Sequence, residues 1–364
     1  MRIRRRELSE IANELPAIVP WEEEDSRAAG NIFVCALGFE PRCLALPEML
    51  AASAARYRFG VKLRFSTNLL DNVRNESQLD NALGVVCKEV IELNADQPEF
   101  TSELRRLLQA SRRNSSEDLA VTLDISVFAN RLVMRSMSAL LHEEVTLRVG
   151  YCEAKNYYPT REEYLSSRSA WNIETVLGLE RGVAEVATSI DHPGYHFDRL
   201  PDKVILFPSF KAERSMAVVS AIDPSILLAP SKKLVWVLGK PHLPENSWRL
   251  DAMKEINGIP AEALTYEVST FNYLETLHIL ENIYERFADE SNLTISPLGS
   301  KLQALGTSLF CRLRPDVRVV FAVPKEYNAL HYSTGVEAVW KIRLGDTDSL
   351  GRRLASVGEL VMGA

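Results

Sequence analysis

The chain has 364 residues, of which 46% are hydrophobic and 25% are charged, as in ordinary globular proteins. This length is enough for two domains, and the composition excludes a largely disordered chain. The net charge of −7 argues against general nucleic-acid binding, which favours a basic surface.

The sequence also lacks long apolar runs and paired cysteines, and this restricts the kinds of protein it can be. No apolar run has the length of a signal peptide or of a membrane-spanning helix, so we expect no membrane association. The five cysteines are scattered and show neither a CxxC pair nor a zinc-binding spacing. Thiols of this kind are typical of a reduced, cytoplasmic protein, and we expect neither a metal nor a cofactor.

The first half of the chain alternates short apolar runs with helical stretches. Residues 1–30 form an N-terminal extension with a predicted helix near 7–14. The runs that predict strands are 31–37, 61–65, 89–93, 119–125 and 145–151. Strands that alternate with helices indicate right-handed βαβ crossovers and a mainly parallel sheet. We therefore expect a Rossmann-like domain over residues 31–173.

The second half repeats this order after a predicted linker over residues 174–202. Its predicted strands are 203–207, 233–238, 264–268, 293–295 and 317–323. We expect a second Rossmann-like domain over 203–345 and a C-terminal tail over 346–364. The predicted fold class is therefore α/β, with two tandem Rossmann-like domains and mainly parallel sheets.

The two halves also share residues at a constant offset. Pairs of similar residues lie 170 positions apart: Ser126 and Ser296, Arg131 and Lys301, Tyr151 and Phe321, Tyr157 and Tyr327. An offset this long indicates a duplicated domain, since the repeats of solenoid proteins are far shorter. Duplicated halves related by a pseudo-twofold axis can bring equivalent residues to one cleft.

The clearest local motif runs from Ser296 to Lys301, between a predicted strand and a predicted helix. Gly299 would let backbone N–H groups approach an anion, Ser300 can cap the helix, and Lys301 adds a positive charge. The alternative is an ordinary capped turn. The first copy, Ser126 to Arg131, lacks the glycine, so its anion site would be weaker.

Cationic side chains follow the predicted strands in both halves. Those expected at the carboxyl edges of the sheets are Arg42, Arg131, Lys211, Arg214, Lys240 and Lys301. Ligands of open parallel sheets bind at this edge. Several cations in an acidic protein therefore predict an anionic small ligand, with phosphate as the leading candidate group. The ligand would be a phosphate-bearing small molecule or a nucleotide.

Glu40 and Arg42 follow the first strand and allow two interpretations. They can pair with each other or cap the next helix, or Arg42 can bind phosphate or base while Glu40 holds a ribose hydroxyl. Glu40 is also the candidate catalytic carboxylate if the protein cleaves a nucleotide or nucleoside. Tyr157 and Tyr327, after the fifth strands, can stack on a base or pack in the core.

The Ser296–Lys301 block resembles the strand-four motif of CRISPR-associated Rossmann-fold (CARF) sensors. A chain with two such halves is similar in plan to the SAVED sensors of bacterial antiphage systems. The resemblance implies an oligonucleotide messenger, cyclic or linear, as ligand. It also implies ligand contacts from these residues: Ser296, Gly299, Ser300 and Lys301, with Ser126 and Arg131 opposite. No effector domain is visible, so such a sensor would act through a separate partner protein.

The sequence supports three hypotheses. The first is a nucleotide-sensing subunit of a bacterial defence or stress system, suggested by the cations and the lack of a catalytic constellation. The second is an enzyme that cleaves a nucleotide or nucleoside with Glu40. The third is a scaffold that binds a protein partner.

Overall fold

The computed structural model describes residues 3–5, 7–27, 30–53, 55–113, 118–168, 180–228, 233–357 and 360–362. The chain forms two compact units. Unit 1 combines Met1–Tyr157 with Tyr332–Ala364, and unit 2 is Tyr158–His331. Unit 2 is therefore inserted between two parts of unit 1.

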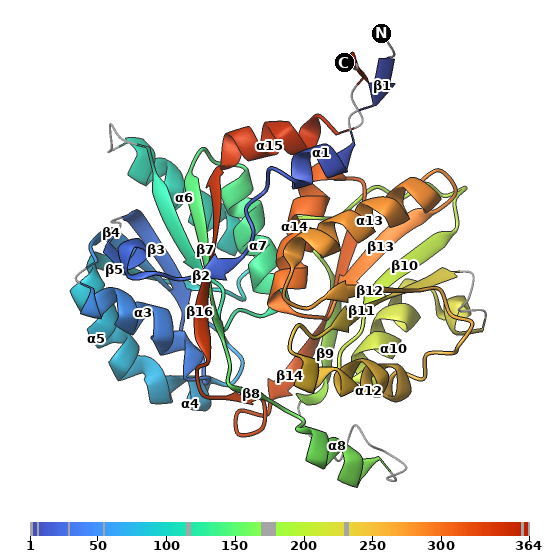
Figure 1. Ribbon diagram of the computed structural model, residues 1–364, viewed down its shortest axis with the longest axis horizontal. Helices are drawn as coiled ribbons and strands as arrows, with labels where there is room; N and C mark the ends of the chain where they lie inside the picture. Colours follow the sequence, from blue (N-terminus) through green and yellow to red (C-terminus); the bar gives the residue numbers. More distant parts are fainter. Residues whose placement is uncertain are drawn as a thin grey trace. The chain divides into compact units, whose positions relative to one another are not determined.

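Unit 1 contains a seven-stranded sheet with the order β2-β16-β7-β6-β3-β4-β5 (Figure 1). The strands are β2 (Val19–Pro20), β3 (Gly30–Ala36), β4 (Tyr57–Arg64), β5 (Cys87–Asn94), β6 (Ala120–Asp124), β7 (Thr146–Glu153) and β16 (Ala338–Asp346). The five strands from β5 to β7 are parallel. β16 runs antiparallel to β7, and β2 runs antiparallel to β16.

Helices connect and cover these strands. They are α1 (Leu8–Ala12), α2 (Glu23–Arg27), α3 (Arg42–Ala52), α4 (Leu69–Asn72), α5 (Glu76–Val86), α6 (Phe100–Arg113), α7 (Asn130–Leu141) and α15 (Thr347–Ala355), with the 3-10 helix η1 (Val73–Asn75). Two short antiparallel pairs complete the unit: β1 (Ile3–Arg5) with β17 (Leu360–Met362), and β8 (Asn156–Tyr157) with β15 (Ser333–Thr334).

Unit 2 contains a six-stranded sheet with the order β12-β11-β10-β13-β14-β9. The strands are β9 (Glu180–Thr188), β10 (Asp202–Phe207), β11 (Leu234–Lys240), β12 (Thr265–Ser269), β13 (Asn292–Pro297) and β14 (Arg318–Tyr327). All neighbours are parallel except β9 and β14. The helices are α8 (Arg161–Ser167), α10 (Ala212–Ile222), η2 (Pro224–Leu228), η3 (Pro244–Asn246), α12 (Trp248–Ile256), α13 (Tyr273–Phe287) and α14 (Lys301–Leu313).

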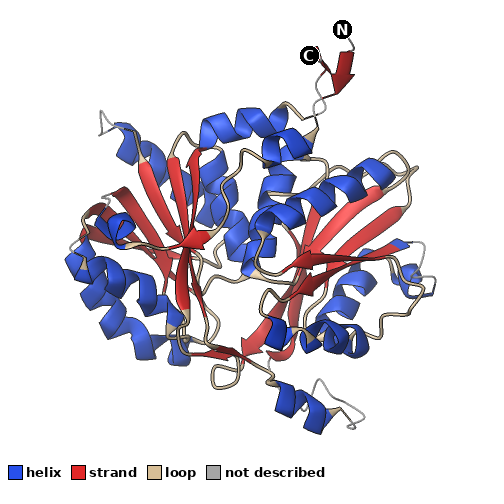
Figure 2. Ribbon diagram, in the orientation of Figure 1, coloured by secondary structure: helices blue, strands red, loops and turns tan. Residues whose placement is uncertain are grey.

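Helices flank the sheet in each unit (Figure 2), and the predicted mixed α/β, Rossmann-like fold with two mainly parallel sheets is confirmed. Buried strands explain the apolar runs, because side chains on both faces of a parallel sheet are covered. Ile32–Leu37 of unit 1 and Val204–Phe207 of unit 2 are almost wholly buried.

The two sheets share one strand order. Each sheet has a run of five parallel strands, β5-β4-β3-β6-β7 in unit 1 and β12-β11-β10-β13-β14 in unit 2, and then one antiparallel strand, β16 or β9. Unit 1 adds the short strand β2 beyond β16. An internal duplication would produce this shared topology, and it remains our interpretation of the repeat.

The antiparallel strands change the expected division of the chain. β9 lies within the predicted linker 174–202 and pairs with β14 of unit 2. β16 lies within the predicted second domain 203–345, yet it pairs with β7 of unit 1. Each strand covers an edge whose backbone N–H and C=O groups would otherwise be unpaired. β16 therefore belongs to the sheet of unit 1, although it follows unit 2 in the chain.

Candidate functional site

The strand order changes direction between β3 and β6 in unit 1, and between β10 and β13 in unit 2. Helices diverge at such a switch point, and ligands of doubly wound sheets bind beyond the carboxyl ends of the strands there. The sequence-predicted residues follow these strands.

In unit 2, the turn from β13 to α14 is closed by a capping box. Ser300 is the N-cap of α14, and its hydroxyl accepts a hydrogen bond from the backbone N–H of Gln303 at 3.2 Å. The side chain of Gln303 in return accepts from the backbone N–H of Ser300 at 2.8 Å. The prediction that Ser300 caps this helix is confirmed.

The side chain of Gln303 packs closely against Gly299. A Cβ at Gly299 would lie 2.2 Å from Oε1 of Gln303, well inside van der Waals contact. Gly239 at the end of β11 also faces this amide, since a Cβ there would lie 3.3 Å from Nε2 of Gln303. The sequence predicted that an anion would approach the backbone at Gly299, and the structure places the side chain of Gln303 beside this residue.

The N-termini of α13 and α14 lie beside each other at this edge. The hydroxyl of Ser300 donates to the carbonyl of Thr270 at 2.6 Å, just before α13. Asn272 is the N-cap of α13 and accepts from the backbone N–H of Leu274 at 3.1 Å. Each helix N-terminus carries roughly half a positive charge, so two neighbouring N-termini make this edge attractive to an anion.

Two buried polar groups near the connection from β13 to α14 have no hydrogen-bond partner in the described part of the chain. They are Oγ of Ser296 and Nε2 of Gln303, on residues that are 0% and 2% exposed. A buried polar atom without a partner costs about 1–3 kcal/mol. A polar ligand or water at this turn would supply the missing hydrogen bonds.

The predicted cations of unit 2 have different surroundings. Arg214 donates through Nε and a terminal nitrogen to the carbonyl of Ala322, at 3.1 and 2.8 Å, and thereby anchors β14. Lys211 precedes α10 and forms an ion pair with Glu213 at 3.5 Å. Lys240 is exposed at the end of β11, and Lys301 is half-buried in the first turn of α14. Lys301 therefore lies next to the N-cap of α14, whereas the guanidinium of Arg214 is hydrogen-bonded to the backbone of β14.

The equivalent turn of unit 1 satisfies its own serine. The hydroxyl of Ser126 donates to the carboxylate of Asp124 and accepts from the backbone N–H of Cys152 at 2.8 Å. Burial raises the pKa of Asp124 to about 6, and the hydrogen bonds from Ser126 partly oppose this shift. The residue at the repeat position of Asp124 is Thr294, whose hydroxyl accepts from Arg318 at 3.0 Å. Ser296 therefore lacks the carboxylate that Ser126 has as a partner, and its hydroxyl has no partner in the described residues.

Glu40 and Arg42 form an ion pair at the start of α3. The two side chains are 4% and 1% exposed as residues, and a terminal nitrogen of Arg42 lies 2.5 Å from the Glu40 carboxylate. Ser333 of β15 donates to the same carboxylate. Of the two interpretations of this pair, the structure shows the mutual pairing. It leaves the carboxylate of Glu40 buried and engaged by Arg42 and Ser333.

Tyr157 joins the same cluster through its phenol oxygen. This oxygen accepts from Arg42 at 3.4 Å and from the backbone N–H of Ala154 at 3.1 Å, and lies 3.0 Å from the hydroxyl of Tyr151. Arg42 also donates to the carbonyl of Cys152 at 3.1 Å. The phenol of Tyr157 is therefore committed to the interior of unit 1.

The remaining predicted residues stand outside these clusters. Arg131 is half-buried in the first turn of α7, and Tyr327 is half-buried at the end of β14. In the described residues no group of three or more His, Cys, Asp and Glu side chains is placed to hold a metal ion. Within the same residues, every helix is too short or too polar to cross a bilayer.

Sequence reasoning missed Gln303, although its signal was present. A Ser at the N-cap followed three residues later by Gln is a capping-box pattern. Ser300 and Gln303 fit it. That pattern would have placed the amide beside Gly299.

Comparison with known proteins adds little to this geometry. No protein-family model matches the chain, and no curated protein matches it. Among solved structures, the chain is similar to the cytoplasmic domain of a prokaryotic cation chloride cotransporter, with 11% sequence identity and a TM-score of 0.24. The match covers 83% of this chain and 99% of that one, but at this TM-score it carries no argument about fold or function.

Proposed function

We propose that the chain binds a phosphate-bearing nucleotide at the carboxyl edge of the unit 2 sheet, with the phosphate at the N-terminus of α14. The observation that carries this proposal is two buried, unpartnered polar atoms: Oγ of Ser296 near the end of β13, and Nε2 of Gln303 in the first turn of α14, beside the N-terminus of α13. Both atoms can donate to phosphate oxygens, and Lys301 adds the positive charge.

The energies of these contacts can be compared with the free energy that micromolar binding requires. One helix N-terminus contributes about 0.3–1 kcal/mol to anion binding, and a hydrogen bond to a charged group about 1.5–3 kcal/mol. Micromolar affinity requires about 8 kcal/mol, after the cost of immobilising the ligand. The phosphate alone therefore supplies only part of the affinity, and the rest must come from other portions of the ligand.

The resemblance to CARF and SAVED sensors supports a finer proposal. The chain would be the sensing subunit of a bacterial antiphage or stress system, and its messenger would be an oligonucleotide, cyclic or linear. It would act through a separate effector protein. No observation favours the enzyme alternative, because the carboxylate of Glu40 is buried and engaged by Arg42 and Ser333.

Two serines at equivalent repeat positions provide a matched test. Isothermal titration calorimetry would measure the binding of mononucleotides and cyclic oligonucleotides to the wild type and to three variants. Ser296→Ala removes an atom without a partner, so it should weaken binding without lowering the melting temperature. Lys301→Ala should also weaken binding.

Ser126→Ala is the control variant. It removes the hydrogen bonds to Asp124 and Cys152, so it should lower the melting temperature and leave the affinity unchanged. If no nucleotide binds the wild type, the proposal is rejected. If Ser296→Ala and Lys301→Ala bind as the wild type does, the ligand site lies elsewhere.

A further inference from the structure

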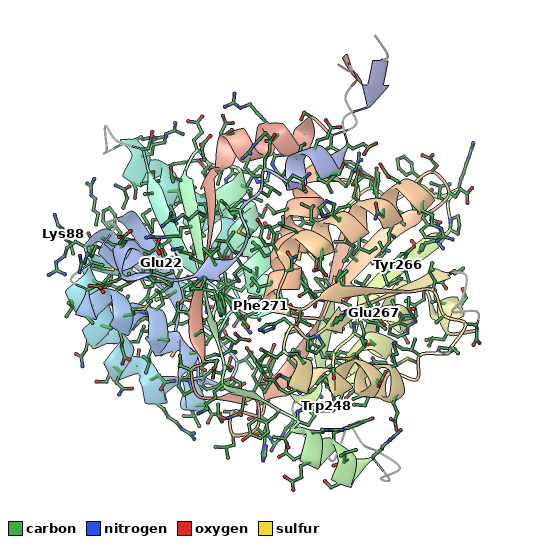
Figure 3. All side chains as sticks on the ribbon, viewed as in Figure 1. Glu22, Lys88, Trp248, Tyr266, Glu267 and Phe271 are labelled. Carbon is green, nitrogen blue, oxygen red and sulfur yellow. The ribbon has the colours of Figure 1, made fainter. Side chains whose placement is uncertain are left out.

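A stacked pair of aromatic rings lies at the same edge of unit 2. The ring centroids of His242 and Phe271 are 4.2 Å apart, and the ring planes differ by 26°. His242 follows β11 and Phe271 follows β12, two neighbouring parallel strands. Figure 3 labels Phe271 beyond the end of β12. The rings therefore sit where a ligand of the sheet would bind.

Backbone hydrogen bonds fix both loops. The N–H of Thr270 donates to the carbonyl of Lys240 at 2.9 Å, which joins the two loops. The N–H of Phe271 donates to the hydroxyl of Ser269 at 3.0 Å. Two rings on anchored backbone can receive a planar ligand group with little loss of conformational entropy.

The same loop reaches the proposed phosphate site. Thr270, the neighbour of Phe271 in the chain, accepts through its carbonyl from the hydroxyl of Ser300 at 2.6 Å. A 5′-mononucleotide carries its base on C1′ and its phosphate on O5′ of the same ribose, so the two groups bind neighbouring parts of one site. A phosphate at the N-terminus of α14 would thus place the base within reach of Phe271 and His242.

The chemistry of the pair suits a nucleobase. His242 is exposed and Phe271 is half-buried, so the stack is accessible from solvent. Aromatic side chains bind bases by stacking, because every base presents a π-face. We propose that His242 and Phe271 form the stacking platform for the nucleobase of the ligand, an inference that rests on the proposed function.

Two probes separate the platform from the phosphate site. Adenosine 5′-monophosphate carries base and phosphate, whereas ribose 5-phosphate lacks the base, and calorimetry to millimolar concentrations measures both. Stacking contributes about 1–3 kcal/mol per base, so the wild type should bind the nucleotide about 5- to 150-fold more tightly than the sugar phosphate. Phe271→Ala should remove most of this preference without changing the affinity for ribose 5-phosphate.

Further variants control for folding and position. His242→Ala should also reduce the preference, whereas His242→Phe keeps an aromatic ring and should retain it. Tyr195→Ala removes an aromatic side chain that is 64% exposed on the loop after β9, and it should change nothing. Lys301→Ala should lower the affinity for both probes by the same factor.

The outcomes distinguish the two proposals. If the wild type binds both probes equally, or Phe271→Ala keeps the preference, the platform is rejected while the phosphate site stands. If the wild type binds neither probe, the proposed function fails, and the platform fails with it.

Discussion

The hydroxyl of Ser333 donates a hydrogen bond to the carboxylate of Glu40, although the two residues are 293 positions apart in the chain. Arg42 holds the same carboxylate, and β8 and β15 pair beside it. Unit 1 is thus completed only when the chain returns from unit 2. This places Glu40 and Arg42 in the scaffold of the protein.

The buried pair predicts a large stability effect for Arg42. Arg42→Ala would leave Glu40 buried without its cation, and it should lower the free energy of unfolding by about 3–5 kcal/mol in a urea titration. The control is Arg352→Ala, which removes an arginine whose side chain is 74% exposed in a helical pair with Asp348. It should have no measurable effect. A stable Arg42→Ala protein that loses nucleotide binding would instead show that Arg42 contacts the ligand.

The phenol of Tyr157 should matter for stability and not for binding. Tyr157→Phe removes the oxygen that accepts from Arg42 and Ala154 while keeping the ring. Leaving buried donors without an acceptor should cost about 1–3 kcal/mol, as measured by urea unfolding. The nucleotide affinity should stay the same. A loss of affinity at unchanged stability would support the alternative, in which Tyr157 contacts the ligand.

Asp124 predicts a specific dependence of stability on pH. Burial raises its pKa from 3.8 to about 6. Between these values the native state binds a proton that the unfolded chain has released, so the stability contributed by this group falls as the pH rises from about 4 to about 6. Over this pH range the free energy of unfolding should fall by about 3 kcal/mol because of Asp124.

Asp124→Asn isolates this effect, because the amide does not titrate and its oxygen can still accept from Ser126. Urea unfolding of both proteins near pH 4 and near pH 7.5 gives the measurement. As the pH rises from about 4 to about 7.5, the free energy of unfolding of the variant should increase by about 3 kcal/mol relative to that of the wild type. A difference that does not change with pH would contradict the raised pKa.

Two glycines form a matched pair for the turn before α14. Gly299→Ala would push Cβ into the side chain of Gln303 and disrupt the capping box, which should cost about 1–2 kcal/mol and weaken nucleotide binding. A Cβ at Gly84 in α5 would have no atom within 4 Å, so Gly84→Ala should raise the free energy of unfolding by up to about 1 kcal/mol. Thermal unfolding and calorimetry measure the two effects. Equal stability of the two variants would show that Gln303 moves aside without cost.

Several elements could be predicted because their signals are local. The apolar runs 31–37 and 203–207 identified buried strands, since such strands are apolar on both faces. Ser300 identified a helix start, because an N-cap uses residues within one turn. The strands β9 and β16 were missed, because charged residues interrupt their apolar runs and their partners are distant in sequence.

The amino-acid sequence by itself determined the alternation of strands and helices, the repeated motif and the cap of α14, all of which depend on periodicity or on neighbours within a few residues. Only the tertiary structure decided that Arg42 is held by Glu40, and that Ser126 is engaged while Ser296 is not. It also decided that His242 and Phe271 stack. These relationships depend on which strands become neighbours in a sheet. Strand pairing joins segments far apart in the chain, and no local pattern encodes it.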